Sequence, residues 1–115
     1  MSDDYQIPIP PSFHALHSDP RGRLTLPLAE FRTRYELCED MAQQLVERAQ
    51  AAHHDIGLAE DEVLARCHAG VGEPEVGLSA DEAAWVTLRL AELLGWPFPD
   101  WLPPPTAAGR PSPPR

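Results

Sequence analysis

Apolar residues recur at helical spacing through the middle of the chain. From Leu28 onward they alternate spacings of three and four residues, which is the pattern of one face of an α-helix. The stripe consists of Leu28, Phe31, Tyr35, Cys38, Ala42, Leu45, Ala49 and Ala52. It predicts a long first helix over residues 27–54, with Pro27 suited to the first position and Gly57 placed to end it.

Two shorter helices are expected after this one. The first covers about residues 59–69, and Gly70 and Gly72 are expected to end it, because glycine is typical just beyond a helix end. Its apolar face consists of Val63, Leu64 and Cys67. The second helix begins with a capping box, in which Ser79 is the N-cap and Glu82 lies three residues later. It runs to about Leu94, where glycine and proline follow.

The fourteen prolines divide the chain around these helices. Because proline breaks helix interiors, they mark residues 1–26 as an extended arm and residues 97–115 as a proline-rich tail, disordered after about residue 105. Residues 27–96 then form a small all-α, three-helix bundle with one long and two shorter helices. This core of roughly 70 residues is near the lower limit for independent folding. We expect the arm and the tail to pack on its outside.

The charge is concentrated in the helical part. The net charge is −9, and residues 27–96 hold five arginines against fourteen acids. This excludes the basic footprint of a nucleic-acid-binding protein. The negative charge increases solubility, or it favours docking on a partner protein with a basic surface.

The sequence contains two cysteines. It has no apolar run long enough to span a membrane and no apolar segment near the N-terminus. They predict a cytoplasmic protein with free thiols and no membrane partner.

One polar cluster has the composition of a metal site. His53 and His54 precede Cys67 and His68 by about thirteen residues, and histidine with cysteine suits zinc. The spacing of known zinc motifs is missing, however, and adjacent histidines point about 100° apart on a helix. Helix-terminal histidines and a buried cysteine explain the same residues. A metal-binding protein or metal-assisted enzyme using these four residues is therefore kept as the alternative hypothesis.

Other catalytic chemistry has less support. The chain has no lysine, so a conventional P-loop is impossible. Both cysteines lie on apolar stripes and read as small core residues. The paired acids read as solvated helix faces. We expect no cofactor and, on balance, no catalysis.

Aromatic residues are the strongest candidates for binding. Tyr35, Trp85, Trp96, Phe98 and Trp101 are expected to contact a partner protein, because such residues are enriched in interface hot spots. They are also the largest core residues available to a small domain, so some of them are expected to seal the bundle. A homodimer through the stripe of the first helix is a further possibility.

Three segments carry a resemblance. Residues 7–13 (IPIPPSF), 34–40 (RYELCED) and 61–64 (DEVL) resemble short uncharacterised proteobacterial proteins that are often described as "ATPase with chaperone activity". The resemblance covers nearly the whole chain up to Trp96. It implies ATP hydrolysis, which the absence of a P-loop and of lysine contradicts, so it assigns no catalytic residue.

Taken together, these patterns predict a non-catalytic cytoplasmic interaction or adaptor protein, with a chaperone-like or ATPase-associated role in view of the resemblance.

Overall fold

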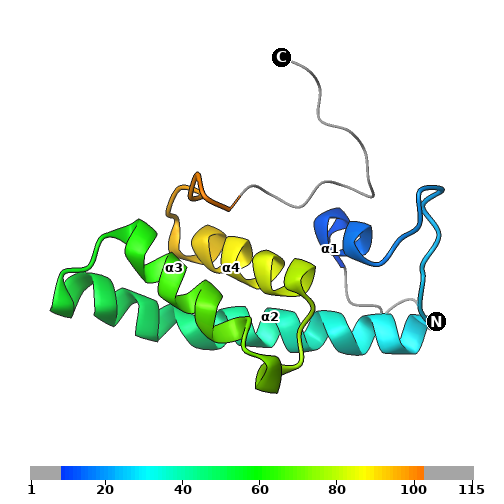
Figure 1. Cartoon of the computed structure of the whole chain (residues 1–115), viewed down its shortest axis with the longest axis horizontal. Coiled ribbons are helices and arrows are strands. Elements are labelled where there is room, and N and C mark those ends of the chain that lie inside the picture. Colours follow the sequence, from blue (N-terminus) through cyan, green and yellow to red (C-terminus); the bar gives the residue numbers. More distant parts are fainter. Residues whose placement is uncertain (1–8, 103–115) are drawn as a thin grey trace, which may run out of the picture.

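The computed structural model describes residues 9–102 of the 115-residue chain, and it confirms the all-α fold. Over that range the chain forms four α-helices and no strand beyond a single bridge between Ser18 and Leu24. The helices are α1 (Pro11–Leu16), α2 (Leu28–Ala51), α3 (Glu60–Val71) and α4 (Ala80–Leu94). Figure 1 shows α3 and α4 lying along the long helix α2, with α1 beside the N-terminal part of α2.

Helix α2 follows the apolar stripe but ends differently from the prediction. Its α-helical part stops at Ala51, and one turn of π-helix, η2 (Ala52–Ile56), continues it. Gly57 then ends the helix with φ 86°, a left-handed conformation that glycine adopts without steric cost. The stripe also starts later than expected, because Leu28 is 54% exposed.

Helices α3 and α4 begin and end close to their predicted positions. The capping box is formed: Ser79 Oγ accepts from the backbone N–H of Glu82, and the Glu82 carboxylate accepts from the backbone N–H of Ser79. Gly95, at φ 73°, ends α4 as predicted. A short 3₁₀ turn, η3 (Pro74–Val76), connects α3 to α4.

Helix α4 lies at the centre of the packing. It contacts α1, α2 and α3, and its main contact is with α2. Val86 and Leu90 on its inner face are fully buried. On a more exposed side, Arg89 donates two hydrogen bonds to the carboxylate of Glu39 on α2, at 2.9 and 3.0 Å. Apolar burial and a bidentate ion pair therefore hold α4 along α2.

The N-terminal arm contributes to the core itself. Phe13 on α1 is fully buried, whereas we expected the arm to pack on the outside of the bundle. Its ring lies 5.1–5.7 Å from the rings of Phe31, Tyr35 and Trp85. The indole N–H of Trp85 also donates to Ser12 Oγ at 2.9 Å. Phe13 therefore fills the space between α2 and α4 at this end of the bundle.

The first part of the tail folds back on the bundle. Pro99 and Leu102 are buried, and the backbone N–H of Leu102 donates to the carbonyl of Pro99. The predicted disorder after about residue 105 and the first eight residues of the arm lie outside the described residues. In the described part of the chain, no helix is both long enough and apolar enough to cross a membrane.

We predict that Phe13→Ala lowers the free energy of unfolding by about 3–5 kcal/mol, because it leaves a cavity at the meeting point of three aromatic rings. Urea denaturation followed by circular dichroism measures the change. Leu28→Ala, at an exposed position, is the matched control and is expected to change it by less than about 0.5 kcal/mol. Equal effects of the two substitutions would show that α1 is not part of the core.

Candidate functional site

The most concentrated polar cluster surrounds Glu82, which is 1% exposed. Its carboxylate accepts hydrogen bonds from Nε and Nη2 of Arg34 on α2. Nε2 of His17 lies 2.8 Å from Oε2 of Glu82, and because a carboxylate only accepts, the histidine donates. Arg34 also donates to the carbonyl of Gly77 at 2.9 Å. The cluster thus connects α2, the residue after α1 and the start of α4.

This cluster has the residue types of an acid–base site but not its electrostatics. Burial alone raises the pKa of Glu82, but hydrogen bonds from Arg34, the Ser79 backbone and His17 outweigh it and lower the pKa to about 2. A carboxylate this acidic is a poor general base near neutral pH. In residues 9–102 no buried side-chain nitrogen or oxygen lacks a hydrogen-bond partner, so this cluster has none to offer a substrate. We interpret it as a structural tie between elements.

The four residues of the metal hypothesis are divided between η2, which holds His53 and His54, and α3, which holds Cys67 and His68. The ring centroids of His53 and His54 are 5.0 Å apart, and Nδ1 of His53 is 2.8 Å from the carbonyl oxygen of Leu58. His68 instead packs near Trp101, and Cys67 is half-buried. Over residues 9–102 no group of three or more His, Cys, Asp or Glu side chains is arranged to hold a metal ion.

The five candidate aromatic residues fall into two groups. Tyr35 and Trp85 are 8% and 4% exposed and pack around Phe13, so nearly all of their ring surface is used in folding. Trp96 is half-buried against His53. Phe98 and Trp101 are 43% and 42% exposed, which leaves about two-fifths of each side chain available to a partner.

A concave, mainly apolar groove lies between α2 and α3, with a volume of about 550 Å³. Its lining comes from α2, η2, α3 and η3 and from the loop residue Leu58; no residue of α1 or α4 in the described chain takes part. The lining residues are Met41, Gln44, Leu45, Arg48, Ala49, Ala52, Ile56, Leu58, Val63, Arg66, Cys67, Gly70, Val71 and Val76. Such a volume is typical of a binding site.

Small residues on the facing helices create this groove. Ala49 on α2, Ala52 on η2 and Gly70 on α3 have little or no side chain, so the surface between the helices is hollowed. Helix α3 packs more extensively on α4 than on α2. The π-helical turn ends at Ile56, which is 72% exposed at one end of the groove. π-Helical turns occur often at functional sites.

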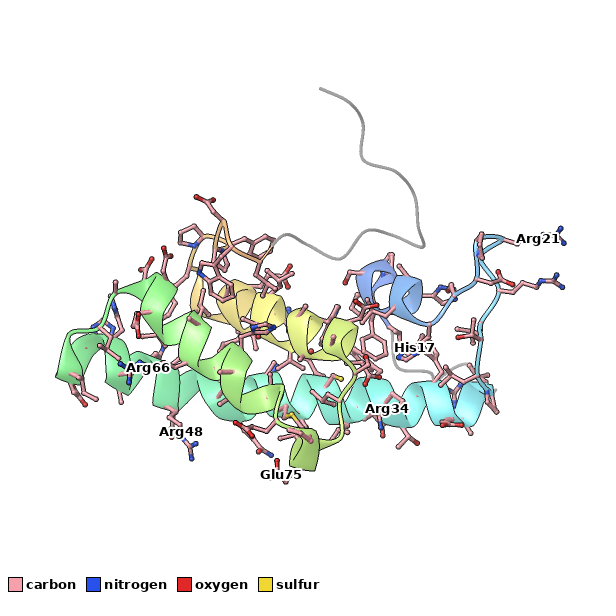
Figure 2. All side chains as sticks on the ribbon, viewed as in Figure 1. His17, Arg21, Arg34, Arg48, Arg66 and Glu75 are labelled. Atoms are coloured by element: carbon pink, nitrogen blue, oxygen red, sulfur yellow. The ribbon has the colours of Figure 1, made fainter. Side chains whose placement is uncertain are left out.

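Two arginines lie on opposite walls of the groove, Arg48 on α2 and Arg66 on α3, and Figure 2 labels both. Arg66 pairs with Glu62 one turn earlier on α3, at 2.9 Å. Arg48 makes no ion pair with another residue of the range 9–102. The lining contains no Asp or Glu, although the chain has eighteen acids.

Both cysteines are poor nucleophiles. Burial raises the pKa of the Cys38 thiol to about 12, and burial also raises the pKa of Cys67, which lines the groove. Because the thiolate is the reactive form, neither residue is activated at neutral pH. The groove is therefore suited to binding rather than to covalent chemistry.

Sequence reasoning missed both the Glu82 cluster and the groove. The sequence pattern identifies Glu82 only as a capping residue, because its partners His17 and Arg34 are 65 and 48 positions away. The change from bulky residues to alanines along the stripe of α2 was the one signal of the groove. Alanines allow close helix packing as readily as they leave a hollow, so that signal was ambiguous.

Comparisons with protein-family models, with curated proteins and with solved structures found no match for this chain.

We predict a specific acid sensitivity from the Glu82 cluster. The folded-state pKa of about 2 lies below the unfolded value of about 4.3, so this stabilisation is present above that value and is lost as the pH falls toward 2. The expected loss is on the order of 2–3 kcal/mol. Urea denaturation between pH 6 and pH 2.5 measures it.

Two variants assign this effect. In Glu82→Gln the stability at pH 6 is expected to be lower and its fall with acid shallower, because the titrating group is gone. Glu62→Gln removes an exposed carboxylate of the surface pair with Arg66 and is expected to leave the profile unchanged. A profile identical in wild type and Glu82→Gln would contradict the assignment.

Proposed function

We propose that the protein is a non-catalytic, cytoplasmic interaction module that binds a segment of another protein in the groove between α2 and α3. The observation that carries this proposal is the groove itself: a hollow of about 550 Å³ lined mainly by apolar side chains. Apolar surface gathered into one concave patch is the usual mark of an interaction site.

The packing supports the same conclusion. Leu45 is half-buried and Ile56 largely exposed along the groove, and covering them would remove apolar area from water. Ala49, Val63 and Val71 belong to the core and also line the groove, so the groove is an uncovered edge of the core. The exposed rings of Phe98 and Trp101 offer a second contact surface beside α3.

The titratable side chains discussed above favour a binding role over a catalytic one. The cysteine thiols have raised pKa values and the buried carboxylate is held ionised by its partners. Binding an apolar protein segment is also compatible with the chaperone-like role that the family resemblance implies. An adaptor that presents such a segment to a larger partner needs no nucleotide site of its own.

The proposal is tested by photocrosslinking in cells that express the protein natively. A photoreactive side chain is placed at Gln44, which lines the groove, or at Glu47, which is exposed on α2 outside the lining. We predict a discrete protein adduct from position 44 and little or none from position 47. Equal adducts from both positions would count against the groove as the contact surface.

A groove-filling variant provides the control. A Cβ atom added at Gly70 meets no heavy atom within 4 Å, so Gly70→Leu projects into the groove without disturbing the fold. It is expected to abolish the adduct from position 44. Ala69→Leu adds a similar side chain at the neighbouring exposed position outside the lining and is expected to leave the adduct intact. Persistence of the adduct in Gly70→Leu would contradict the proposal.

A further inference from the structure

We infer that the segment bound in the groove is an amphipathic α-helix that carries carboxylate side chains beside its apolar stripe. The inference rests on the proposed function and adds the conformation and charge of the partner segment. It differs from the expectation drawn from the net charge, which favoured a basic partner.

The shape of the groove matches a helix. Its α2–η2 wall extends from Met41 to Ile56, which is about 22 Å of helix at 1.5 Å per residue. A partner helix of about four turns covers this length. Leucine-sized side chains at spacings of three and four would enter the hollow above Ala49, Val63 and Gly70.

The architecture leaves room for one more helix on this side. Helix α4 packs against both α2 and α3, whereas the groove between those two helices is lined without α4. The groove therefore opens on the face of the α2–α3 pair that α4 does not cover. A helix bound there would form a four-helix arrangement together with α2, α3 and α4. Figure 1 shows α1 at the other end of α2, away from α3.

The charges of the lining select an acidic helix. Arg48 and Arg66 approach the groove from opposite walls, and the lining has no acid that would repel a carboxylate. Glu62 shares the charge of Arg66, and Glu75 lies on η3 outside the lining, so Arg48 is the principal anion contact. A carboxylate next to the apolar stripe of the partner would reach this guanidinium while its leucines fill the hollow.

Two synthetic peptides of about 18 residues test the inference. They share one leucine stripe and differ only in having glutamate or lysine at the flanking positions. Binding is measured by amide chemical-shift changes in the isotope-labelled protein. We predict that the glutamate peptide binds at least about tenfold more tightly and shifts residues 41–56 and 63–71, although the net charge of −9 favours the lysine peptide.

Charge-reversal variants locate the selectivity. Arg48→Glu is expected to weaken the glutamate peptide about tenfold or more and to strengthen the lysine peptide. Arg21→Glu, in the exposed loop far from the groove in Figure 2, makes the same change in net charge and is expected to leave the peptide preference unchanged. An equal effect of both variants would mean that only the overall charge matters.

Other results overturn the inference in distinguishable ways. A lysine peptide bound in the groove as tightly as the glutamate peptide refutes the acidic partner but leaves the proposed function intact. Sodium dodecanoate bound there more tightly than either peptide identifies a small amphiphile as the occupant. A dimer dissociated by Arg48→Glu in sedimentation identifies a second copy of the chain. If neither peptide shifts the groove resonances, the helical partner is refuted. The crosslink from position 44 tests the proposed function separately.

Discussion

The burial of helix α4 is the constraint on which the structure depends. A domain of this size has few residues that can be surrounded on all sides, and α4 contains more of them than any other helix of the described chain. The other three helices each contact α4. At its N-terminal end Phe13 and Trp85 seal the core, and farther along Leu90 packs with Val63 and Leu64 of α3. Each of the other helices therefore has part of its apolar face against α4.

This arrangement explains why a groove exists beside a well-packed core. Helix α3 packs more extensively on α4 than on α2, so its position does not depend on close packing against α2. Three of the residues that line the space, Ala49, Ala52 and Gly70, are small, and within residues 9–102 the larger lining residues leave a hollow of about 550 Å³. A single-core domain with a third helix held from one side presents a hollow on the other side. The packing of α3 on α4 therefore both stabilises the domain and leaves its candidate binding surface open.

Charge is distributed in a way that the net value conceals. The buried Glu82 is balanced by Arg34 and His17, and Glu39 by Arg89. Two arginines line the groove without any acid in the lining. The acids that give the net charge of −9 belong largely to solvated helix faces. The net charge of the chain is therefore relevant to its solubility, whereas the groove presents positive charge to a ligand.

The sequence by itself determined the local structure. Apolar spacing, the Ser79–Glu82 capping box and the glycines at 57 and 95 predicted α2, α3 and α4 and their ends to within a few residues, because each of these signals acts over one or two turns. Helix α1 was not predicted, because it lies in the arm that was expected to be extended. It also predicted the all-α fold.

Only the tertiary structure decided where Phe13 lies, which aromatic rings remain exposed, and which partners hold Glu82. It alone placed Arg48 and Arg66 across a groove. These features depend on contacts between residues far apart in the chain, and the spacing of residues along one helix does not report how far the next helix stands from it.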